Sequence, residues 1–448
     1  MSKFGHKIKW TAVNLCRLLV AVTFIISGFV KAVDPTGTLY KLQDYASAFG
    51  YAGIVPDWAF LIFAIVLSIF EFCIGIYLFF GIRRKMTTIS LMVFMCLMTP
   101  LTFYLAWFNP ISDCGCFGDA FKLTNWQTFL KNLFLLFASV VLFVYRLFMT
   151  RFISERNQWM ISMYSIFFIW ILASWCLYRL PVLDFRPYHI GANLIEGMQI
   201  PEDAEQPEYE TTFIMEKDGV QKEFTIEDYP DSTWTFVDSQ TRLIKAGYEP
   251  LIHDFSMISF ESGEDLTEQI LADTSYTFLL VSPRLSVADD GRMDLINEVY
   301  DYSREYQYAF YCLTASGEDD IVQWCEKTGA EYPFCLSDEI TLKTIIRSNP
   351  GLLLLKGGVV INKWSHNNLP DETQLNDSLD RLALGQLNVD SATMRFLKLV
   401  LWFCVPLVLL TFADRIWIGS KMYKRFKHRN NLLNQLKVNE NEKENCSR

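Results

Sequence analysis

The sequence has few histidines, a residue that many soluble enzymes use for zinc binding and for nucleophilic triads. It contains five histidines in 448 residues. His189, His253 and His366 stand apart from any Cys, Asp or Ser partner at the spacing of a zinc site or a nucleophilic triad. No glycine-rich phosphate loop is present. These absences argue against a zinc enzyme, a triad hydrolase and a nucleotide-binding protein.

Charge is also scarce, at 20% of residues against 51% hydrophobic residues, and the apolar residues are concentrated toward the two ends of the chain. A run of about 20 apolar residues is long enough to cross a bilayer as a helix. Six such runs predict six transmembrane helices, at residues 11–32, 57–80, 88–108, 127–148, 158–180 and 395–414. Because Arg17 interrupts the first run and no cleavage site stands out, we expect it to be a retained helix.

The charges that remain are unevenly distributed. Residues 181–394 hold 39 acidic and 14 basic residues, whereas the chain termini and the 82–85 and 146–156 loops are basic. By the positive-inside rule, both termini are predicted to be cytoplasmic. We therefore expect a multi-pass protein of the bacterial inner membrane, with the 33–56 loop and residues 181–394 on the periplasmic side. The acidic surface disfavours nucleic acid and anionic lipid as partners.

The predicted fold is an all-α four-helix membrane bundle, plus one further span on each side of an α/β extracytoplasmic domain. Alternating polar and apolar residues around Asp218-Gly219 predict a β-hairpin, and from about residue 250 strand and helix patterns alternate. The expected division is a bundle (1–150), a fifth span (151–180), a juxtamembrane segment with the hairpin (181–248), the α/β domain (249–390), a sixth span (391–416) and a basic tail (417–448).

Among 11 cysteines, only Cys114 and Cys116 form a close pair, in the loop "DCGCFGD". Three interpretations are open: thiol–disulfide exchange, a soft-metal site such as Cu(I), and a structural disulfide or turn. The loop has no His or Met to complete a metal shell, so no metal site is predicted. Cys176 lies near the outer end of the fifth span and is a candidate redox partner. Cys335 is a second candidate, which we expect to be exposed.

Charged residues inside spans are costly and are expected to find partners. Arg17 in the first span and Glu71 in the second lie at similar predicted depths, which predicts an intramembrane pair, either structural or proton-conducting. Lys31, at the outer end of the first span, is expected either to extend toward the interface or to lower a thiol pKa in the Cys114–Cys116 loop. Asp113, next to Cys114, would oppose that effect.

The membrane half resembles the DoxX and methylamine-utilisation MauE group of small four-helix membrane proteins. The matching segments are "ISGFVKAVDPTGT" (26–38), "FEFCIGIYLFFGIRRK" (70–85) and "DCGCFGD" (113–119). The resemblance favours redox exchange at the cysteine pair. No cofactor is evident from the residues, and the family analogy implies a quinone as one electron acceptor.

The α/β domain resembles thioredoxin-fold proteins of the redoxin kind, through "HDFSM", "GEDLT" and "IIRSNPGLLLLKGGVV". The resemblance implies a cis peptide at Asn349-Pro350 and a surface that binds polypeptide. Where such proteins carry Cys-x-x-Cys, this chain has "VSPRLSVADD", which argues against independent thioredoxin-type catalysis.

The leading hypothesis is therefore an inner-membrane thiol–disulfide exchange protein with Cys114 and Cys116 as the reactive pair. The thioredoxin-like domain would then recognise an envelope protein as client. The alternative is a non-enzymatic membrane scaffold that binds an envelope protein and in which the cysteine pair is structural. Small-molecule transport is a weaker option, because no span is broken twice by Gly or Pro.

Overall fold

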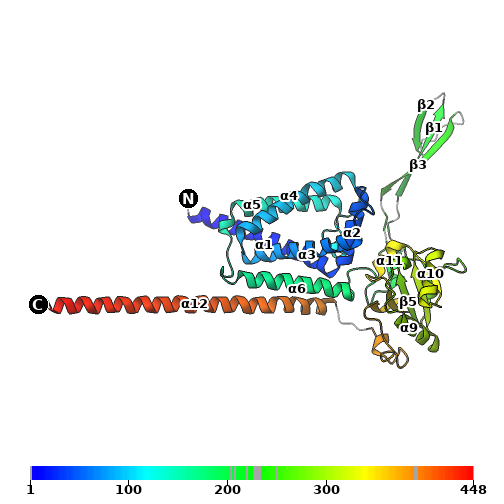
Figure 1. Cartoon of the computed structure of the whole chain (residues 1–448). Helices are drawn as coiled ribbons and strands as arrows, with labels where there is room; N and C mark the ends of the chain where they lie inside the picture. Colours follow the sequence, from blue (N-terminus) through cyan, green and yellow to red (C-terminus); the bar gives the residue numbers. More distant parts are fainter. Residues whose placement is uncertain are drawn as a thin grey trace. The chain divides into compact units, whose positions relative to one another are not determined.

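The computed structural model (Figure 1) describes residues 3–111, 113–201, 204–205, 208–217, 220–225, 234–245, 247–248, 250–387 and 392–446. The chain divides into two compact units, which are described separately. Met1–Arg186 and Val389–Arg448 form the first, and Pro187–Asn388 form the second.

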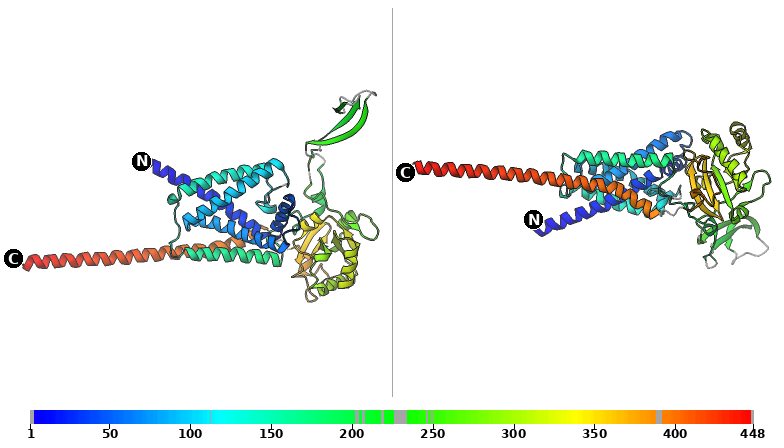
Figure 2. Two further views of the ribbon diagram at one scale, coloured as in Figure 1. Left: turned by 45° about the horizontal axis from the view of Figure 1, so that its top comes forward. Right: turned by 90° about the horizontal axis from the view of Figure 1, so that it is seen from below.

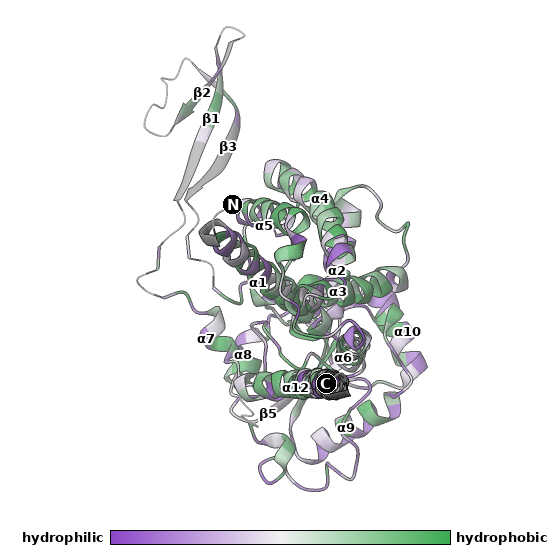
Figure 3. Cartoon of the chain, turned by 90° about the vertical axis from the view of Figure 1, so that its left-hand side faces the viewer, coloured by the Kyte–Doolittle hydropathy of each residue, from purple (hydrophilic) through white to green (hydrophobic). Residues whose placement is uncertain are grey.

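The first unit contains the apolar helices. Six helices among the described residues are long and apolar enough to cross a membrane, which confirms the predicted number of spans. Apolar residues line most of α3, α4 and α5 (Figure 3). The chain is thus a multi-pass membrane protein. The six helices are α1 (Lys3–Val33), α3 (Asp57–Phe80), α4 (Arg84–Phe108), α5 (Asn125–Val144), α6 (Gln158–Tyr178) and α12 (Ala392–Cys446).

Two apolar clusters hold these helices together. One joins α1, α3, α4 and α5 through buried side chains such as Phe24, Leu78, Met95 and Leu135. The other joins α1 and α3 to α6 and α12, so α6 packs as part of the helical core. The two views of Figure 2 show α6 and α12 side by side. The ring centroids of Phe168 on α6 and Phe403 on α12 lie 4.6 Å apart.

Helices α1 and α3 approach each other closely at two glycines. A Cβ atom added to Gly28 would lie 2.4 Å from the backbone nitrogen of Phe72. A Cβ atom at Gly75 would lie 2.7 Å from the backbone nitrogen of Ile25. Small residues at helix interfaces allow backbones to come this near in a membrane. The two contacts fix the register of α1 against α3.

The 33–56 segment, treated above as a loop, contains the helix α2 (Pro35–Ala48). Asp34 caps its N-terminus by accepting a hydrogen bond from the Gly37 amide at 2.8 Å, and Pro35 occupies the first turn. The capping signal is local and readable in "VDPTGT". The helix carries two residues that contact the cysteine loop. A 3-10 turn, η1 (Gly118–Ala120), follows that loop, and η2 (Arg146–Phe148) follows α5.

The second unit has a six-stranded mixed sheet in the order β4-β7-β6-β5-β8-β9. Strands β5, β6 and β7 are parallel, and β8 and β9 are antiparallel to their neighbours. This arrangement confirms the predicted thioredoxin-like α/β fold. The strands are β4 (Ile258–Ser259), β5 (Tyr276–Ser282), β6 (Ala309–Thr314), β7 (Phe334–Leu336), β8 (Gly351–Lys356) and β9 (Val359–Ser365).

Every residue of the central strand β5 is buried, so both faces of the sheet are covered there. Phe278 and Leu280 pack against the apolar stripe of α9, which includes Ile296 and Val299. The helices of this unit are α7 (Leu194–Met198), α8 (Thr267–Ala272), α9 (Met293–Glu305), α10 (Glu318–Thr328) and α11 (Glu339–Ile345), with 3-10 turns η3 (Leu285–Val287) and η4 (Ala383–Gly385).

A separate three-stranded sheet in the order β2-β1-β3 precedes the thioredoxin-like fold. Its strands are β1 (Glu208–Lys217), β2 (Val220–Thr225) and β3 (Thr235–Lys245), all paired antiparallel. The β1–β2 pairing agrees with the predicted hairpin strands, while its predicted turn residues Asp218-Gly219 lie outside the described residues.

Replacing Gly28 by Val should force α1 and α3 apart, because the new side chain meets the backbone of α3. We expect a loss of about 1–3 kcal/mol of stability, typical of overpacking, measured as a lower thermal unfolding temperature of the detergent-purified protein. Gly419→Val on α12 is the control, since nothing lies within 4 Å of a Cβ atom there. Equal unfolding temperatures for the two variants would contradict the close contact.

Candidate functional site

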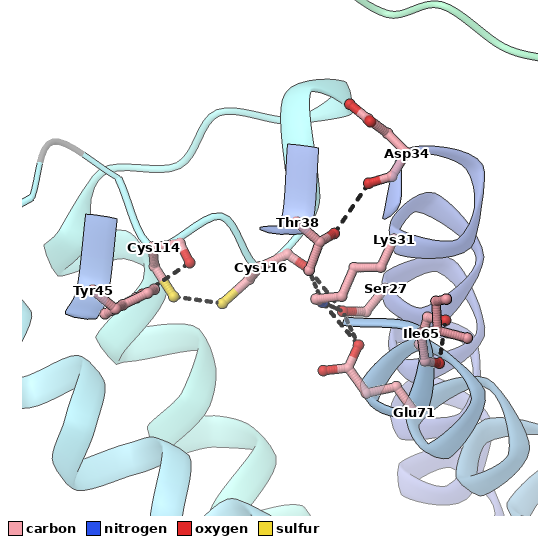
Figure 4. Close-up of polar contacts among 10 residues, drawn as sticks. Ser27, Lys31, Asp34, Thr38, Tyr45, Ile65, Glu71, Cys114 and Cys116 are labelled. Carbon is pink, nitrogen blue, oxygen red and sulfur yellow. Dashed lines mark hydrogen bonds and ion pairs between the residues drawn. The ribbon is translucent and has the colours of Figure 1, made fainter. Parts of the chain in front are cut away.

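The cysteine pair lies in the loop between α4 and α5, outside the two spans (Figure 4). The Sγ atoms of Cys114 and Cys116 are 2.7 Å apart. Gly115 between them has φ +64°, and a Cβ atom there would lie 3.0 Å from Cγ of Lys41. Glycine is thus required both by the left-handed backbone and by the space. This local geometry brings the two thiols together.

Helix α2 and Asp113 hold the Cys114 side of the loop. Lys41 forms an ion pair with Asp113 at 2.9 Å, and the other oxygen of that carboxylate accepts a hydrogen bond from the Gly115 amide at 2.8 Å. The hydroxyl of Tyr45 donates to the carbonyl oxygen of Cys114 at 2.9 Å. Lys41 and Tyr45 are four residues apart and share one face of α2.

A buried ion pair holds the Cys116 side. The ammonium of Lys31 donates to the carbonyl oxygen of Cys116 at 2.7 Å, to Oγ of Ser27 at 2.8 Å and to the Glu71 carboxylate at 2.8 Å. These contacts occupy all three ammonium protons. The Ser27 hydroxyl lies 2.8 Å from both the Glu71 carboxylate and the Cys116 carbonyl. Lys31 and Glu71 are only 6% and 5% exposed.

The predicted Arg17–Glu71 pair is wrong. Arg17 donates instead to the carbonyl oxygen of Thr150 at 2.6 Å, and its guanidinium lies over the ring of Phe152. The contact of Gly28 with α3 sets Glu71 level with the C-terminal end of α1, eleven residues or about 16 Å of helix from Arg17. Counting residues from the end of each helix estimates the depth of a side chain, but it does not give the register of α1 against α3.

The two thiols have different electrostatic surroundings. A hydrogen bond from the Cys114 thiol, with the positive charges of Lys131 and Lys31, lowers the pKa of Cys116 to about 6 against the opposing effect of burial. The same shared hydrogen bond, followed by burial, raises the pKa of Cys114. The structure thus places Lys31 where the sequence led us to expect a thiol-tuning charge. It also adds Lys131 of α5, whose ammonium lies 4.4 Å from the centre of the Phe117 ring.

A cavity of about 320 Å³ adjoins the pair. Its polar lining comes from the loop, from one face of α2, and from Thr23, Ser27, Lys31, Glu71, Lys131 and Asn132. Its remaining walls are largely apolar side chains of α1, α3, α4 and α5. Such a lining suits an amphipathic molecule whose polar head lies near the sulfurs. Among the described residues, no group of three or more His, Cys, Asp or Glu side chains is arranged to hold a metal ion. The apolar walls include Phe24, Phe63, Leu67, Phe94, Met95, Met98, Leu101 and Leu135.

The two candidate partner cysteines lie elsewhere. Cys176 is buried on α6 among apolar residues of the second cluster and does not line the cavity. Cys335 is on β7 in the other unit and is only 1% exposed, so its predicted exposure is wrong. Burial raises the pKa of Cys335 to about 11. Strand β7 buries this side chain because β4 and β6 pair with it on either side.

The Asn349-Pro350 peptide bond is cis, as the sequence resemblance implied. The side-chain oxygen of Asn349 accepts a hydrogen bond from the Ser282 hydroxyl at 2.7 Å, and its amide donates to the carbonyl oxygen of Arg284 at 2.9 Å. These bonds tie the segment after β5 to the loop before β8. The segment after β5 carries no cysteine.

Sequence reasoning missed Ser27, Lys41, Tyr45 and Lys131. Two local signals were available: Ser27 and Lys31 are four residues apart, and "DPTGTLYKLQDY" begins with a helix cap and places Lys41 and Tyr45 on one face. No local signal pairs Lys41 and Tyr45 with a loop about 70 positions away.

Comparisons with known proteins agree with this division of the chain. Residues 9–145 match the family model of methylamine utilisation protein MauE, which confirms the MauE resemblance of the membrane region. Residues 209–246 match the model of a domain of unknown function, DUF8463. A comparison with curated proteins finds no match.

Several solved structures are similar to part of the chain. A thiol-disulfide oxidoreductase from Bacteroides fragilis is 15% identical, with 25% of this chain and 86% of that chain covered and a TM-score of 0.21. An uncharacterized conserved protein from Geobacillus kaustophilus is 12% identical, with coverages of 31% and 82% and a TM-score of 0.24. A thiol peroxidase from Chromobacterium violaceum is 10% identical, with coverages of 28% and 81% and a TM-score of 0.21.

Lys31→Met should destabilise the bundle, because it leaves the buried Glu71 carboxylate without its cation. Removing one partner of a buried pair costs about 3–5 kcal/mol, and the double variant with Glu71→Gln should recover part of that loss. The measurement is thermal unfolding of the purified protein, with the exposed Lys122→Met as control. A double variant no more stable than Lys31→Met would contradict the ion pair.

Proposed function

We propose that the chain is a membrane thiol–disulfide exchange protein whose reactive pair is Cys114 and Cys116. The observation that carries this proposal is the 2.7 Å separation of the two Sγ atoms in a loop at the end of two spans. Both side chains are partly exposed and line a cavity. A dithiol of this kind can reduce a partner disulfide, and the disulfide it then forms can be reduced again.

The MauE match of residues 9–145 and the thioredoxin-like fold of the second unit are consistent with a redox-related membrane protein. We place the reactive loop and the α/β unit on the periplasmic side of a bacterial inner membrane, with both termini cytoplasmic. The basic termini and alternate short loops support this orientation. Disulfides persist in that compartment, as the proposed chemistry requires.

In this proposal, the thioredoxin-like unit recognises an envelope protein as client and performs no thiol chemistry at the segment after β5. Two observations support a binding role. That segment has no cysteine, and Asn349 holds it against the loop that carries the cis peptide. Val287 and Ile340, on η3 and α11 of the same unit, are 70% and 75% exposed. Burial of these two side chains against a client would be favourable.

The electron acceptor of the pair is proposed to be a membrane-soluble quinone. The cavity of about 320 Å³ beside the sulfurs supports this choice, since it combines apolar walls with lysine and tyrosine donors. Cys176 does not line that cavity, which favours a small molecule over a cysteine relay within the helices. Two electrons and two protons would pass from the dithiol to the quinone, giving a quinol and a Cys114–Cys116 disulfide, and client thiols would then reduce that disulfide as the client forms its own disulfide.

Thiol trapping in intact cells tests the exchange reaction. We expect Cys114 and Cys116 to be found in both reduced and oxidised forms. We also expect the Cys114→Ser/Cys116→Ser variant to lose all mixed disulfides with other proteins. Cys96→Ser, on the exposed surface of α4, is the matched control and should behave as the unaltered protein.

A different result would favour the scaffold alternative. In that case the pair would stay in one redox state, the double variant would behave as the unaltered protein, and crosslinking would capture an envelope partner without any disulfide through Cys114 or Cys116.

A further inference from the structure

The two sulfurs of the proposed reactive pair cannot both carry a negative charge near neutral pH. At a separation of 2.7 Å, two thiolates would repel each other strongly. A single thiolate, by contrast, accepts a hydrogen bond from its neighbour, so the first ionisation belongs to the pair. The surrounding charges decide which sulfur is the thiolate.

The cation on the Cys114 side is neutralised. Lys41 is paired with Asp113 at 2.9 Å and lies 3.9 Å from Asp44. The hydroxyl of Tyr45 donates to the carbonyl oxygen of Cys114. Lys41 therefore adds little net positive charge to this side of the loop.

The Cys116 side has an unbalanced cation. Lys31 reaches the Cys116 carbonyl but is itself paired with Glu71 at 2.8 Å. Lys131 lies over the ring of Phe117, the residue that directly follows Cys116. Of the three lysines that line the cavity, Lys131 is the one with no ion pair among the described residues. Its charge lowers the pKa of both thiols, and the charge of Lys31 lowers the pKa of Cys116 as well.

We propose that Cys116 is the attacking sulfur of the pair, that Cys114 is the resolving thiol, and that Lys131 is a positioning residue whose charge holds the Cys116 thiolate. The proposal rests on the exchange function above and assigns roles within that site. The lowered pKa of Cys116 and the raised pKa of Cys114 agree with this assignment.

The exchange then proceeds in two balanced steps. The Cys116 thiolate attacks one sulfur of a client disulfide, so a Cys116–client bond forms, the client S–S bond breaks, and the second client sulfur leaves as a thiolate. Cys114 loses its proton to that thiolate or to water and attacks the Cys116 sulfur. The Cys114–Cys116 disulfide closes and the first client sulfur is released. In this direction two electrons pass from the pair to the client, whose released thiolate takes a proton from water. With a quinone as electron acceptor the same two steps run in reverse: client thiols reduce the Cys114–Cys116 disulfide through the same Cys116–client bond, and the quinone reoxidises the pair.

The test is the pH dependence of iodoacetamide labelling of the reduced, full-length protein in detergent, with each labelled cysteine identified by peptide mass spectrometry. We expect Cys116 to be labelled before Cys114, with a midpoint near pH 6. Below that midpoint Cys116 is protonated and its labelling slows. In Lys131→Met, the midpoint should rise and labelling at pH 6 should slow about three- to tenfold.

Two matched variants accompany this measurement. Lys131→Arg keeps the charge and should restore the original profile. Lys122→Met removes an exposed lysine of the same loop and should leave the profile unchanged. Labelling of Cys114 first, in the unaltered protein, would overturn the role assignment without any variant. A Lys131→Met profile identical to that of Lys122→Met would overturn the role of Lys131.

These outcomes are independent of the trapping experiment in cells. If the pair never changes its redox state in cells, the exchange function fails even when Cys116 is the more reactive thiol. If the pair cycles in cells but Cys114 is labelled first, the exchange function stands and the present assignment fails.

Discussion

The close contact between α1 and α3 is the constraint on which the site depends. Gly28 and Gly75 let the two backbones approach until a Cβ atom would no longer fit. That approach sets Glu71 level with Ser27 and Lys31. A buried ion pair is favourable only when hydrogen bonds satisfy its charged groups. Here the Lys31 ammonium uses all its protons, one of them on the backbone of Cys116. The same contact therefore holds the bundle together and positions the loop.

The loop is held from two sides by contacts of different kinds. On the Cys116 side the contact is a buried charge network between spans, which is shielded from solvent and salt. On the Cys114 side it is the partly exposed Lys41–Asp113 pair and the Tyr45 hydroxyl, both from α2. Together they hold two sulfurs side by side while leaving both residues partly exposed. This asymmetry is the physical basis for assigning different roles to the two cysteines.

The second unit combines a thioredoxin-like sheet with a segment after β5 that lacks thiols. Asn349 accepts a hydrogen bond from the Ser282 hydroxyl and donates one to the carbonyl oxygen of Arg284. These two bonds connect that segment to the loop before β8. Cys312 and Cys335 of this unit are buried, and Cys325 is partly exposed on α10. We therefore propose that the membrane unit performs the thiol exchange and that the thioredoxin-like unit recognises the client.

The sequence alone determined the elements and the chemical types. Hydropathy and periodicity were sufficient for the six spans and for the alternation of strands and helices in the second unit, because these signals are local and repeat over many residues. The short elements α7, β4, α8 and β7 and the strand β3 were not predicted. The spacing of Cys114 and Cys116 in a loop between spans was likewise enough to single out that pair. Helix α2 was also within reach, since Asp34 and Pro35 form a standard start signal.

Only the tertiary structure decided which charges meet. The Arg17–Glu71 prediction used depth along each helix, but a partner is set by helix register and by the face that a side chain occupies. Both depend on where two glycines allow backbones to touch. Lys41 and Tyr45 of α2 and Lys131 of α5 reach the cysteines from positions that neither periodicity nor spacing relates to the loop. Sequence thus identified the thiols, and packing between distant helices determined the charges that surround them.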